Sequence, residues 1–257
     1  MSNNRGTVSP LLSVHGLSLA QGAPPFDVDF YEAEIVGLAG LEGHGQQLFL
    51  EVLCGLRKPL SGTVNVHLSA GHTVTVHDLR SAVRAGLAYL PRERKTQGIF
   101  PSLSVLDNFA IATLGRTARL GFINGQVHRQ QLQAFRDKLS MVYASPQAPI
   151  TSLSGGNQQK LLLARWLAAS PRIMLLNDPT RGVDVQTKMT LYDVFDDMVE
   201  NERKTLIMLS TEIDELIRLC HRTLVFRDAA LFAELPRETI TRAKVIAAMF
   251  GRAYAQE

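Results

Sequence analysis

The sequence has little cysteine and no long apolar run. Only Cys54 and Cys220 occur among the 257 residues. They lie far apart, without a Cys-x-x-Cys pair or a Cys/His cluster, so neither a disulfide framework nor a zinc site is indicated. We expect both to be small core residues in a reducing compartment. No apolar stretch approaches the roughly 18 residues that a membrane-spanning helix needs, and the polar residues 1–7 lack the apolar core of a secretory signal. Any membrane connection is expected to run through partner subunits.

An excess of charge of one sign is also missing. Lys and Arg total 27 against 24 Asp and Glu, a net charge of +3. So small an excess does not favour nucleic acid binding, and we expect no nucleic acid partner. The densest basic run, residues 92–95, includes Glu93 and is interpreted as a solvated loop. An apolar content of 46% is ordinary for a soluble globular protein, and the length suits one large α/β domain, with or without a small lobe.

The first third of the chain is mostly strand-like. Short apolar or alternating runs are separated by Gly, Pro and Asp, and they predict strands at residues 11–17, 26–30, 35–39, 62–68, 74–76 and 87–90. Helices are predicted over residues 46–54 and 78–85.

The middle of the chain, roughly residues 100–150, is predicted to be helical, with an amphipathic helix over 126–143. From Ser154 onward helices and strands alternate, which favours parallel strands joined by crossover helices. After a first helix the expected order is strand 173–176, helix 185–201, strand 205–209, helix 212–220, strand 223–226 and helix 239–250. The fold class is therefore α/β.

Residues 153–160, Leu-Ser-Gly-Gly-Asn-Gln-Gln-Lys, are the most informative stretch. Ser154 is a natural helix N-cap, and Gly155 and Gly156 let backbone N–H groups approach an anion at the positive end of a helix. A hydroxyl and several N–H donors suit the γ-phosphate of ATP. Alone, such a segment is also typical of a Ser-capped helix without any ligand.

The position of this segment decides between the two readings. An apolar strand follows it and ends in residues 177–184, Asn-Asp-Pro-Thr-Arg-Gly-Val-Asp. In this order the stretches resemble the signature motif, Walker B strand and D-loop of ABC transporter ATPases. Together with residues 89–95 they resemble the second, C-terminal ATP-binding domain of bacterial monosaccharide importers of the ribose, galactose and xylose type, which usually carry two such domains in tandem.

The resemblance implies a P-loop NTPase fold of the ABC type. We expect this domain over residues 11–251, with an antiparallel β subdomain and a helical, signature-bearing subdomain at about 100–165. Residues 1–10 are expected to be a flexible lead or a linker remnant, and residues 252–257 a tail.

A P-loop has the pattern G-x-x-x-x-G-K-[ST], whose lysine neutralises phosphate charge and whose hydroxyl holds Mg²⁺. The matching residues 40–47 are Gly-Leu-Glu-Gly-His-Gly-Gln-Gln. The glycines can still form an anion-binding nest, but Gln46 replaces the lysine and Gln47 the hydroxyl. Without the resemblance this stretch would be interpreted as a glycine-rich turn. The candidate nucleotide-binding residues are Gly40, Gly43, His44, Gly45, Gln46 and Gln47, with a solvent-facing loop histidine as the alternative for His44.

Other catalytic positions implied by the family have changed as well. Asn177 stands where an Asp would hold Mg²⁺, and Asp178 stands at the general-base position with one methylene fewer than Glu. Thr211 falls at the position of the switch histidine. Gln97 is a partial substitute for a glutamine lost at Pro91. We therefore predict a degenerate site that hydrolyses ATP slowly or not at all, without a metal ligand at the Gln47 or Asn177 position.

Three further residues have interpretations that require no catalytic role. Trp166 is expected in the core and Arg181 in a structural position, while Lys160 is expected to face solvent or a partner's nucleotide. Phe26 is only a weak candidate for stacking on adenine.

The resemblance implies the ATP-binding subunit or half-subunit of a sugar importer. Its signature residues Leu153, Ser154, Gly155, Gly156 and Gln158 would complete the ATP site of a partner ATPase domain, with Asp184 across the seam. Cofactors would be ATP and Mg²⁺, the latter bound weakly or through the partner. Further partners would be membrane permease subunits, reached through residues 92–106, and indirectly a periplasmic sugar-binding protein. The location would be peripheral, on the cytoplasmic side of the inner membrane.

Two alternatives remain at this stage. One is a non-catalytic nucleotide-binding regulatory module that forms a homodimer with two degenerate sites. The other is a truncated remnant of a tandem ABC ATPase.

Overall fold

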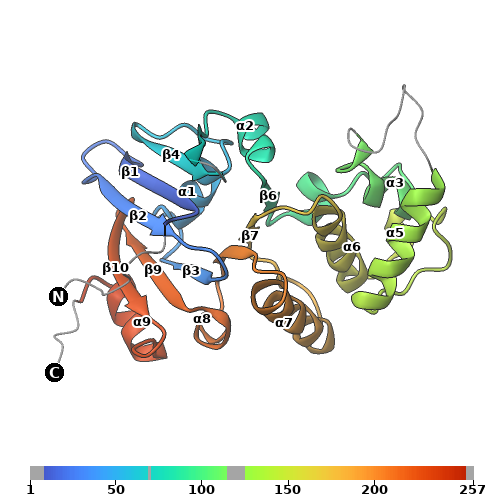
Figure 1. The fold of residues 1–257 in the computed structure, drawn as a ribbon. Helices are drawn as coiled ribbons and strands as arrows, with labels where there is room; N and C mark the ends of the chain where they lie inside the picture. Colours follow the sequence, from blue (N-terminus) through green and yellow to red (C-terminus); the bar gives the residue numbers. More distant parts are fainter. Residues whose placement is uncertain (1–8, 69–70, 115–124, 253–257) are drawn as a thin grey trace. The chain divides into compact units, whose positions relative to one another are not determined.

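The computed structural model describes residues 9–68, 71–114 and 125–252 (Figure 1). The chain divides into two compact units. The sheet unit holds the described residues up to Ala88, Arg172–Asn177 and those from Met198 onward. The signature unit holds Tyr89–Pro171 and Asp178–Asp197, apart from the undescribed residues 115–124. The predicted lead and tail fall largely outside the described residues.

The sheet unit contains a four-stranded antiparallel sheet. Its strand order is β2 (Phe26–Phe30), β1 (Leu12–Ser18), β4 (Ser61–His67) and β5 (Thr73–Thr75). Val14 of β1 lies opposite Val28 on one side and Val64 on the other, and all three are buried. The alternation of apolar and polar residues in these strands therefore gives the sheet one buried face.

A second, six-stranded sheet carries the candidate nucleotide site. Its order is β10 (Ala230–Pro236), β9 (Arg222–Arg227), β3 (Ile35–Ala39), β8 (Thr205–Leu209), β7 (Ile173–Asn177) and β6 (Leu87–Leu90). The pairs β9–β3, β3–β8 and β8–β7 are parallel, and β10 joins as an antiparallel hairpin partner of β9. Every residue of β3, β7 and β8 is buried, as expected for parallel strands covered on both faces.

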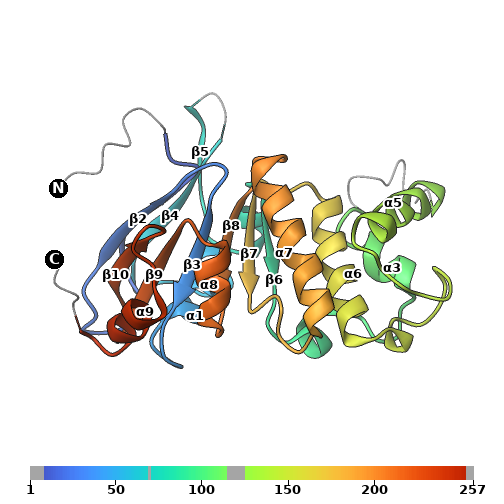
Figure 2. The ribbon, with the colours of Figure 1, turned by 90° about the horizontal axis from the view of Figure 1, so that it is seen from below.

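Helices cover both faces of this sheet. Helix α1 (Gln46–Leu53) lies between the two sheets, while α8 (Ile213–Leu219) and α9 (Arg242–Met249) lie beside β3 and β9 on the opposite face (Figures 1 and 2). A further short helix, α2 (Leu79–Arg84), is capped by Asp78.

Four aromatic rings fill the space around α1. Phe49 of α1 contacts Phe226 of β9 at a centroid distance of 5.0 Å, and Phe26 and Phe30 of β2 pack on the same ring. Phe26 also contacts Phe226 edge-on at 5.9 Å. Phe26 is half-buried, and its stacking on adenine stays a prediction.

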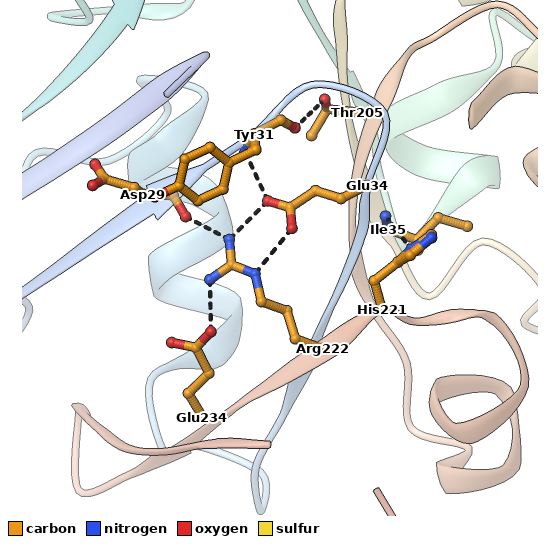
Figure 3. A network of polar contacts seen from close by, with 8 residues as sticks. All are labelled: Asp29, Tyr31, Glu34, Ile35, Thr205, His221, Arg222 and Glu234. Carbon is orange, nitrogen blue, oxygen red and sulfur yellow. Dashed lines mark hydrogen bonds and ion pairs between the residues drawn. The ribbon is translucent and has the colours of Figure 1, made fainter. Parts of the chain in front are cut away.

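A buried arginine ties the β2–β3 connection to β9 and β10 (Figure 3). Arg222 donates to both carboxylate oxygens of Glu34, at 3.0 and 2.7 Å, and to Glu234 at 3.0 Å. A fourth bond reaches the carbonyl oxygen of Asp29, while Glu34 accepts from the backbone N–H of Tyr31 at 2.7 Å. Because both charges of the Arg222–Glu34 pair are buried, each depends on the other for compensation.

The signature unit is mainly helical. It contains a π-helical turn η2 (Arg94–Gly98), α3 (Val105–Ala110), α5 (Gly125–Lys138), a 3₁₀ turn η3 (Ile150–Ser152), α6 (Gly155–Ala168) and most of α7 (Val185–Glu200). Helices α3 and α5 pack together and both contact α6. Arg165 of α6 is buried and donates to the carbonyl oxygens of Gly98 and Asn108, and burial lowers its pKa to about 10. It thereby fixes the segment between η2 and α3.

The predicted elements are largely confirmed, with four corrections. The helix predicted over 126–143 ends at Lys138, because Ser140 takes a left-handed φ of 48° that a helix cannot continue through. The last helix begins at Arg242 rather than at 239, capped by Thr241. Strand β10 was not predicted, and part of the basic run 92–95 forms a π-helical turn rather than an open loop.

Candidate nucleotide and signature sites

The glycine-rich loop, residues 40–47, connects β3 to α1. Gly43 and Gly45 have φ values of 83° and 104°, which favour glycine. Gly45 also lies against the β9–β10 turn, where a Cβ would come within 2.8 Å of the Cα of Ala229. The N–H of Ala229 donates to the carbonyl oxygen of His44 at 3.1 Å. Backbone conformation and close packing therefore both require the glycines that the sequence analysis singled out.

Gln46, predicted at the lysine position of this loop, closes the loop on itself. Its side-chain amide donates to the carbonyl oxygens of Gly40 and Leu41 at 3.1 and 2.9 Å. The residue is only 8% exposed, and within the described chain its Oε1 has no hydrogen-bond partner. Both donors are thus occupied by the loop, and the neutral amide offers no charge to a phosphate.

The positions predicted to hold the metal carry poor ligands. Gln47 is exposed and donates to Glu51 at 3.0 Å. Asn177 ends β7 and is 1% exposed. Within the described residues no three His, Cys, Asp or Glu side chains gather as a metal site. Two amides do not fit Mg²⁺, which prefers carboxylate oxygens and water, so we assign no Mg²⁺-dependent step to this loop.

The remaining predicted positions of this site lie in the sheet unit as well. His44 is half-buried, and its Nδ1 has no hydrogen-bond partner among the described residues. Thr211 is exposed and follows Ser210, whose hydroxyl donates to Glu215 at 2.6 Å. A threonine hydroxyl at this place lacks the titratable nitrogen of a histidine.

Asp178, predicted at the general-base position, is held by an ion pair in the signature unit. Its Oδ2 lies 3.4 Å from Nε of Arg92, and only 4% of the residue is exposed. The backbone at Asp178 is left-handed, with a φ of 54°. Pro91, at the position predicted for a glutamine, is buried. Gln97 is exposed and presents its side-chain amide to solvent.

Ser154 begins α6 as its N-cap and is exposed. Its oxygen accepts from the backbone N–H of Asn157 at 3.3 Å and from the side-chain amide of the same residue at 3.0 Å. Asn157 is itself anchored, because its Oδ1 accepts from the N–H of Val142 at 2.8 Å. With both lone pairs engaged, the hydroxyl proton of Ser154 is available to an external acceptor.

The two signature glycines permit close packing inside the signature unit. A Cβ at Gly156 would lie 2.7 Å from Oγ1 of Thr187, and one at Gly155 would lie 2.6 Å from Nη2 of Arg94. Asp184 accepts from the N–H and hydroxyl of Thr187, both at 2.8 Å, and these bonds lower the pKa of Asp184. The segment predicted as the D-loop is therefore packed directly behind the signature loop.

Several polar residues of α6 are buried, which corrects two expectations. Lys160 is buried and donates to the carbonyl oxygen of Ser140 at 3.2 Å, so the expectation that it faces solvent or a partner's nucleotide is wrong. Gln158 is also buried and donates to the carbonyl oxygen of Leu153 at 3.2 Å, which places it behind the loop rather than on its surface. Trp166 is half-buried and not a core residue.

Sequence reasoning missed Arg94. Its guanidinium donates to the carbonyl oxygens of Arg181 and Gly182, at 2.8 and 3.4 Å, and Arg181 forms an ion pair with Glu93. The partners of Arg94 lie 87 and 88 residues away in the sequence, so no local pattern could indicate them.

The glycine-rich loop, the strand ending at Asn177 and the Ser-capped helix are matched together by a family model. Residues 24–181 match the model described as ABC transporter. The chain belongs to the ABC transporter family.

Relatives in this family include named sugar importers. The chain is 36% identical over 247 residues to a ribose import ATP-binding protein of Rhizobium johnstonii, covering 95% of this chain and 48% of that protein. It is 36% identical over 241 residues to a putative ribose/galactose/methyl galactoside import ATP-binding protein of Geobacillus kaustophilus, covering 94% and 47%. The chain thus spans about half the length of the curated relatives it matches.

The ABC ATPase fold is shared with solved structures. The ATP-binding cassette MJ0796, in a dimeric post-hydrolysis state with ADP and phosphate, superimposes with a TM-score of 0.74 at 20% identity, over 88% of this chain and 98% of that chain. A putative metal-chelate type ABC transporter in an inward-facing conformation gives a TM-score of 0.75 at 20% identity, over 94% of this chain and 88% of that chain. Within the described residues, no helix is both long and apolar enough to span a membrane.

Proposed function

We propose that this chain is the ATP-binding part of a sugar ABC importer, with a degenerate nucleotide site of its own. It would supply its signature loop to the ATP site of a second ATPase domain. The observation that supports this is a contrast within one chain. Ser154 is exposed and its hydroxyl proton is free to face outward, whereas Gln46 uses both amide donors on its own loop.

The signature loop has the groups that a phosphate of a partner's nucleotide requires. Ser154 would donate its hydroxyl, and the N–H groups of Gly155 and Gly156 lie at the N-terminus of the 14-residue helix α6. Such a helix end favours anions through its free N–H groups and its dipole. Asp184, which immediately precedes α7, would lie at the seam with the partner. ATP and Mg²⁺ would be held by the partner's P-loop and would supply the phosphoryl chemistry.

The proposal of sugar transport rests on the names of the relatives, which are import proteins for ribose, galactose or methyl galactoside. Coupling would require membrane permease subunits, contacted by residues 92–106, and indirectly a periplasmic sugar-binding protein. The chain would then act on the cytoplasmic side of the inner membrane. The predicted domain span of 11–251 belongs to the same proposal.

A second candidate function is a regulatory module that dimerises without hydrolysis, and a remnant of a tandem ATPase would behave similarly. The ion pair of Asp178 with Arg92 favours low activity in either case, because it occupies the carboxylate at the general-base position. A homodimer would contain two such sites and show no turnover with any partner domain.

The test is a Ser154→Ala substitution in the complex of this chain with a catalytically complete ATPase domain and permease. Removing one pre-organised donor to a transferring phosphate typically costs about 10²–10³ in rate, so we expect ATP turnover to fall by that factor. Ser152→Ala is the matched control, because Ser152 is exposed, lies two residues before Ser154, and donates its hydroxyl to the carbonyl oxygen of Pro149. Unchanged turnover in Ser154→Ala would overturn the proposal.

A further inference from the structure

A small basic pocket adjoins the signature loop in the signature unit. It has a volume of about 200 Å³, several times the about 30 Å³ that one water molecule occupies in the liquid. Four of its six lining residues are cationic and one is acidic. The lining residues are Arg92, Glu93, Arg94, Lys95, Arg181 and Gly182.

The charges of this pocket are only partly compensated. Arg92 pairs with Asp178, and Arg181 pairs with Glu93. Among the residues that the structure describes, no carboxylate lies within ion-pair distance of Arg94 or Lys95. Arg94 donates only to the carbonyl oxygens of residues 181 and 182, and its buried Nε has no partner in the described chain. A pocket with two uncompensated cations attracts an anion.

The pocket is continuous with the signature loop through Arg94. Nη2 of this side chain lies 2.6 Å from the position that a Cβ of Gly155 would take. Gly155 is the first helical residue of α6, and its N–H is one of those that the helix leaves without an internal partner. The guanidinium therefore lies against the first turn of α6, beside the N-terminal residue Gly155.

We propose that Arg94 and Lys95 form a phosphate-binding site with the signature loop. The ligand class is a tetrahedral phosphate group, because the pocket is too small for a whole nucleotide and a guanidinium matches phosphate oxygens geometrically. Two sources share this chemistry, the terminal phosphate of a nucleotide held by the partner domain and free inorganic phosphate. The first source rests on the proposed function, and the second does not.

The first experiment titrates the isolated full-length chain with inorganic phosphate at low ionic strength, using calorimetry. We expect Arg94→Gln to weaken phosphate binding at least tenfold and Lys95→Gln at least threefold. Lys95 is exposed and supports no other residue in the described chain, so its variant tests the charge even if Arg94→Gln disturbs the loop. Arg129→Gln removes one exposed positive charge from α5 of the same unit and is the control. Absence of phosphate binding by the unmodified chain, or an equal loss in all three variants, would overturn the site.

The second experiment separates the two sources in the complex with a complete ATPase domain. If the terminal phosphate of ATP enters the pocket, Lys95→Gln raises KM for ATP at least threefold. If free phosphate enters it, added phosphate inhibits the unmodified complex and Lys95→Gln relieves the inhibition. If neither effect is observed in the complex, the pocket does not contact the partner's active site.

The outcomes also separate this site from the proposed function. Phosphate binding that depends on Lys95, together with no effect of Ser154→Ala on turnover, would retain the site and reject the proposed function. Loss of turnover in Ser154→Ala without any effect of Lys95→Gln on phosphate binding or turnover would reject the site and retain the proposed function.

Discussion

Arg92 holds the carboxylate of Asp178 in an ion pair, with 3.4 Å between Nε and Oδ2. Asp178 is buried and its backbone is left-handed. The ion pair therefore fixes the position of this carboxylate and directs Oδ2 toward Arg92. Because Asp178 is buried, its negative charge depends on Arg92 for compensation.

Arg92→Gln is expected to destabilise the protein by about 1–3 kcal/mol, because a buried carboxylate then loses its cation. Urea unfolding measures the change in free energy. The double variant Arg92→Gln/Asp178→Asn removes both charges and should recover part of that loss. If the two single effects simply add in the double variant, the two residues are not coupled.

Gln46→Lys/Gln47→Ser is expected to bind MgATP at least tenfold more tightly than the unmodified chain, because it restores a cation and a metal-binding hydroxyl. Displacement of a fluorescent nucleotide from the isolated chain measures the affinity, and Gln47→Ser alone is the control. Tight binding without hydrolysis by the unmodified chain would identify a nucleotide-holding site. No binding by either form would leave the signature loop as the chain's contribution to nucleotide chemistry.

Gly156→Ala is expected to cost about 1–3 kcal/mol, the usual range for an added methyl group in a packed site. The new Cβ would meet Oγ1 of Thr187 at 2.7 Å, Cγ2 of Thr187 at 3.2 Å and Asp184 at 3.3 Å. Gly155→Ala is the matched variant and should cost less, because its closest contact is the end of the flexible Arg94 side chain. Thermal unfolding ranks the two, and equal losses would contradict this packing argument.

Arg222→Met is expected to destabilise the protein by about 3–5 kcal/mol, since it leaves the buried Glu34 without its cation. The exposed pair of Arg203 with Glu32 is the control, and Arg203→Met should change stability by no more than about 1 kcal/mol. Urea unfolding of both variants tests the difference. Similar losses would mean that burial does not set the strength of the Arg222 pair.

Both cysteines should resist thiol reagents until the protein unfolds. Burial raises the pKa of Cys54 from 9.0 to about 12, and burial also raises the pKa of Cys220. The raised pKa means that the folded state favours the protonated thiol. The stability that this preference contributes is fully present below pH 9 and is lost as the pH rises from 9 toward 12. Labelling with a disulfide reagent at pH 8, with and without denaturant, measures accessibility. Fast labelling of the native chain would contradict the buried positions.

The sequence was sufficient for elements whose signal is local. Strands such as β7 and β8 are continuous apolar runs because parallel strands are buried on both faces. The N-cap Ser154 and the positive-φ glycines of residues 40–47 are likewise specified by their own residue types. The family resemblance followed from these local patterns and their order.

Burial along α6 could not be predicted from the sequence. Lys160 and Gln158 are polar and follow a motif that is expected at a surface, yet both are buried and bond to backbone carbonyl oxygens. A helix that is covered on most sides lacks the polar stripe that would reveal its exposed face. The tertiary structure alone decided which of these side chains reach solvent.

The same limit applies to charge pairing. By itself the sequence determined the α/β class, the glycine loop and the Ser-capped helix, because each depends on residues close together in the chain. The contacts of Arg222 with Glu34 and of Arg94 with residues 181 and 182 join positions 188, 87 and 88 residues apart. Which cation meets which acceptor depends on the strands and turns that become neighbours on folding. Only the tertiary structure therefore decided that Asp178 pairs with Arg92 and that Arg94 lies against Gly155.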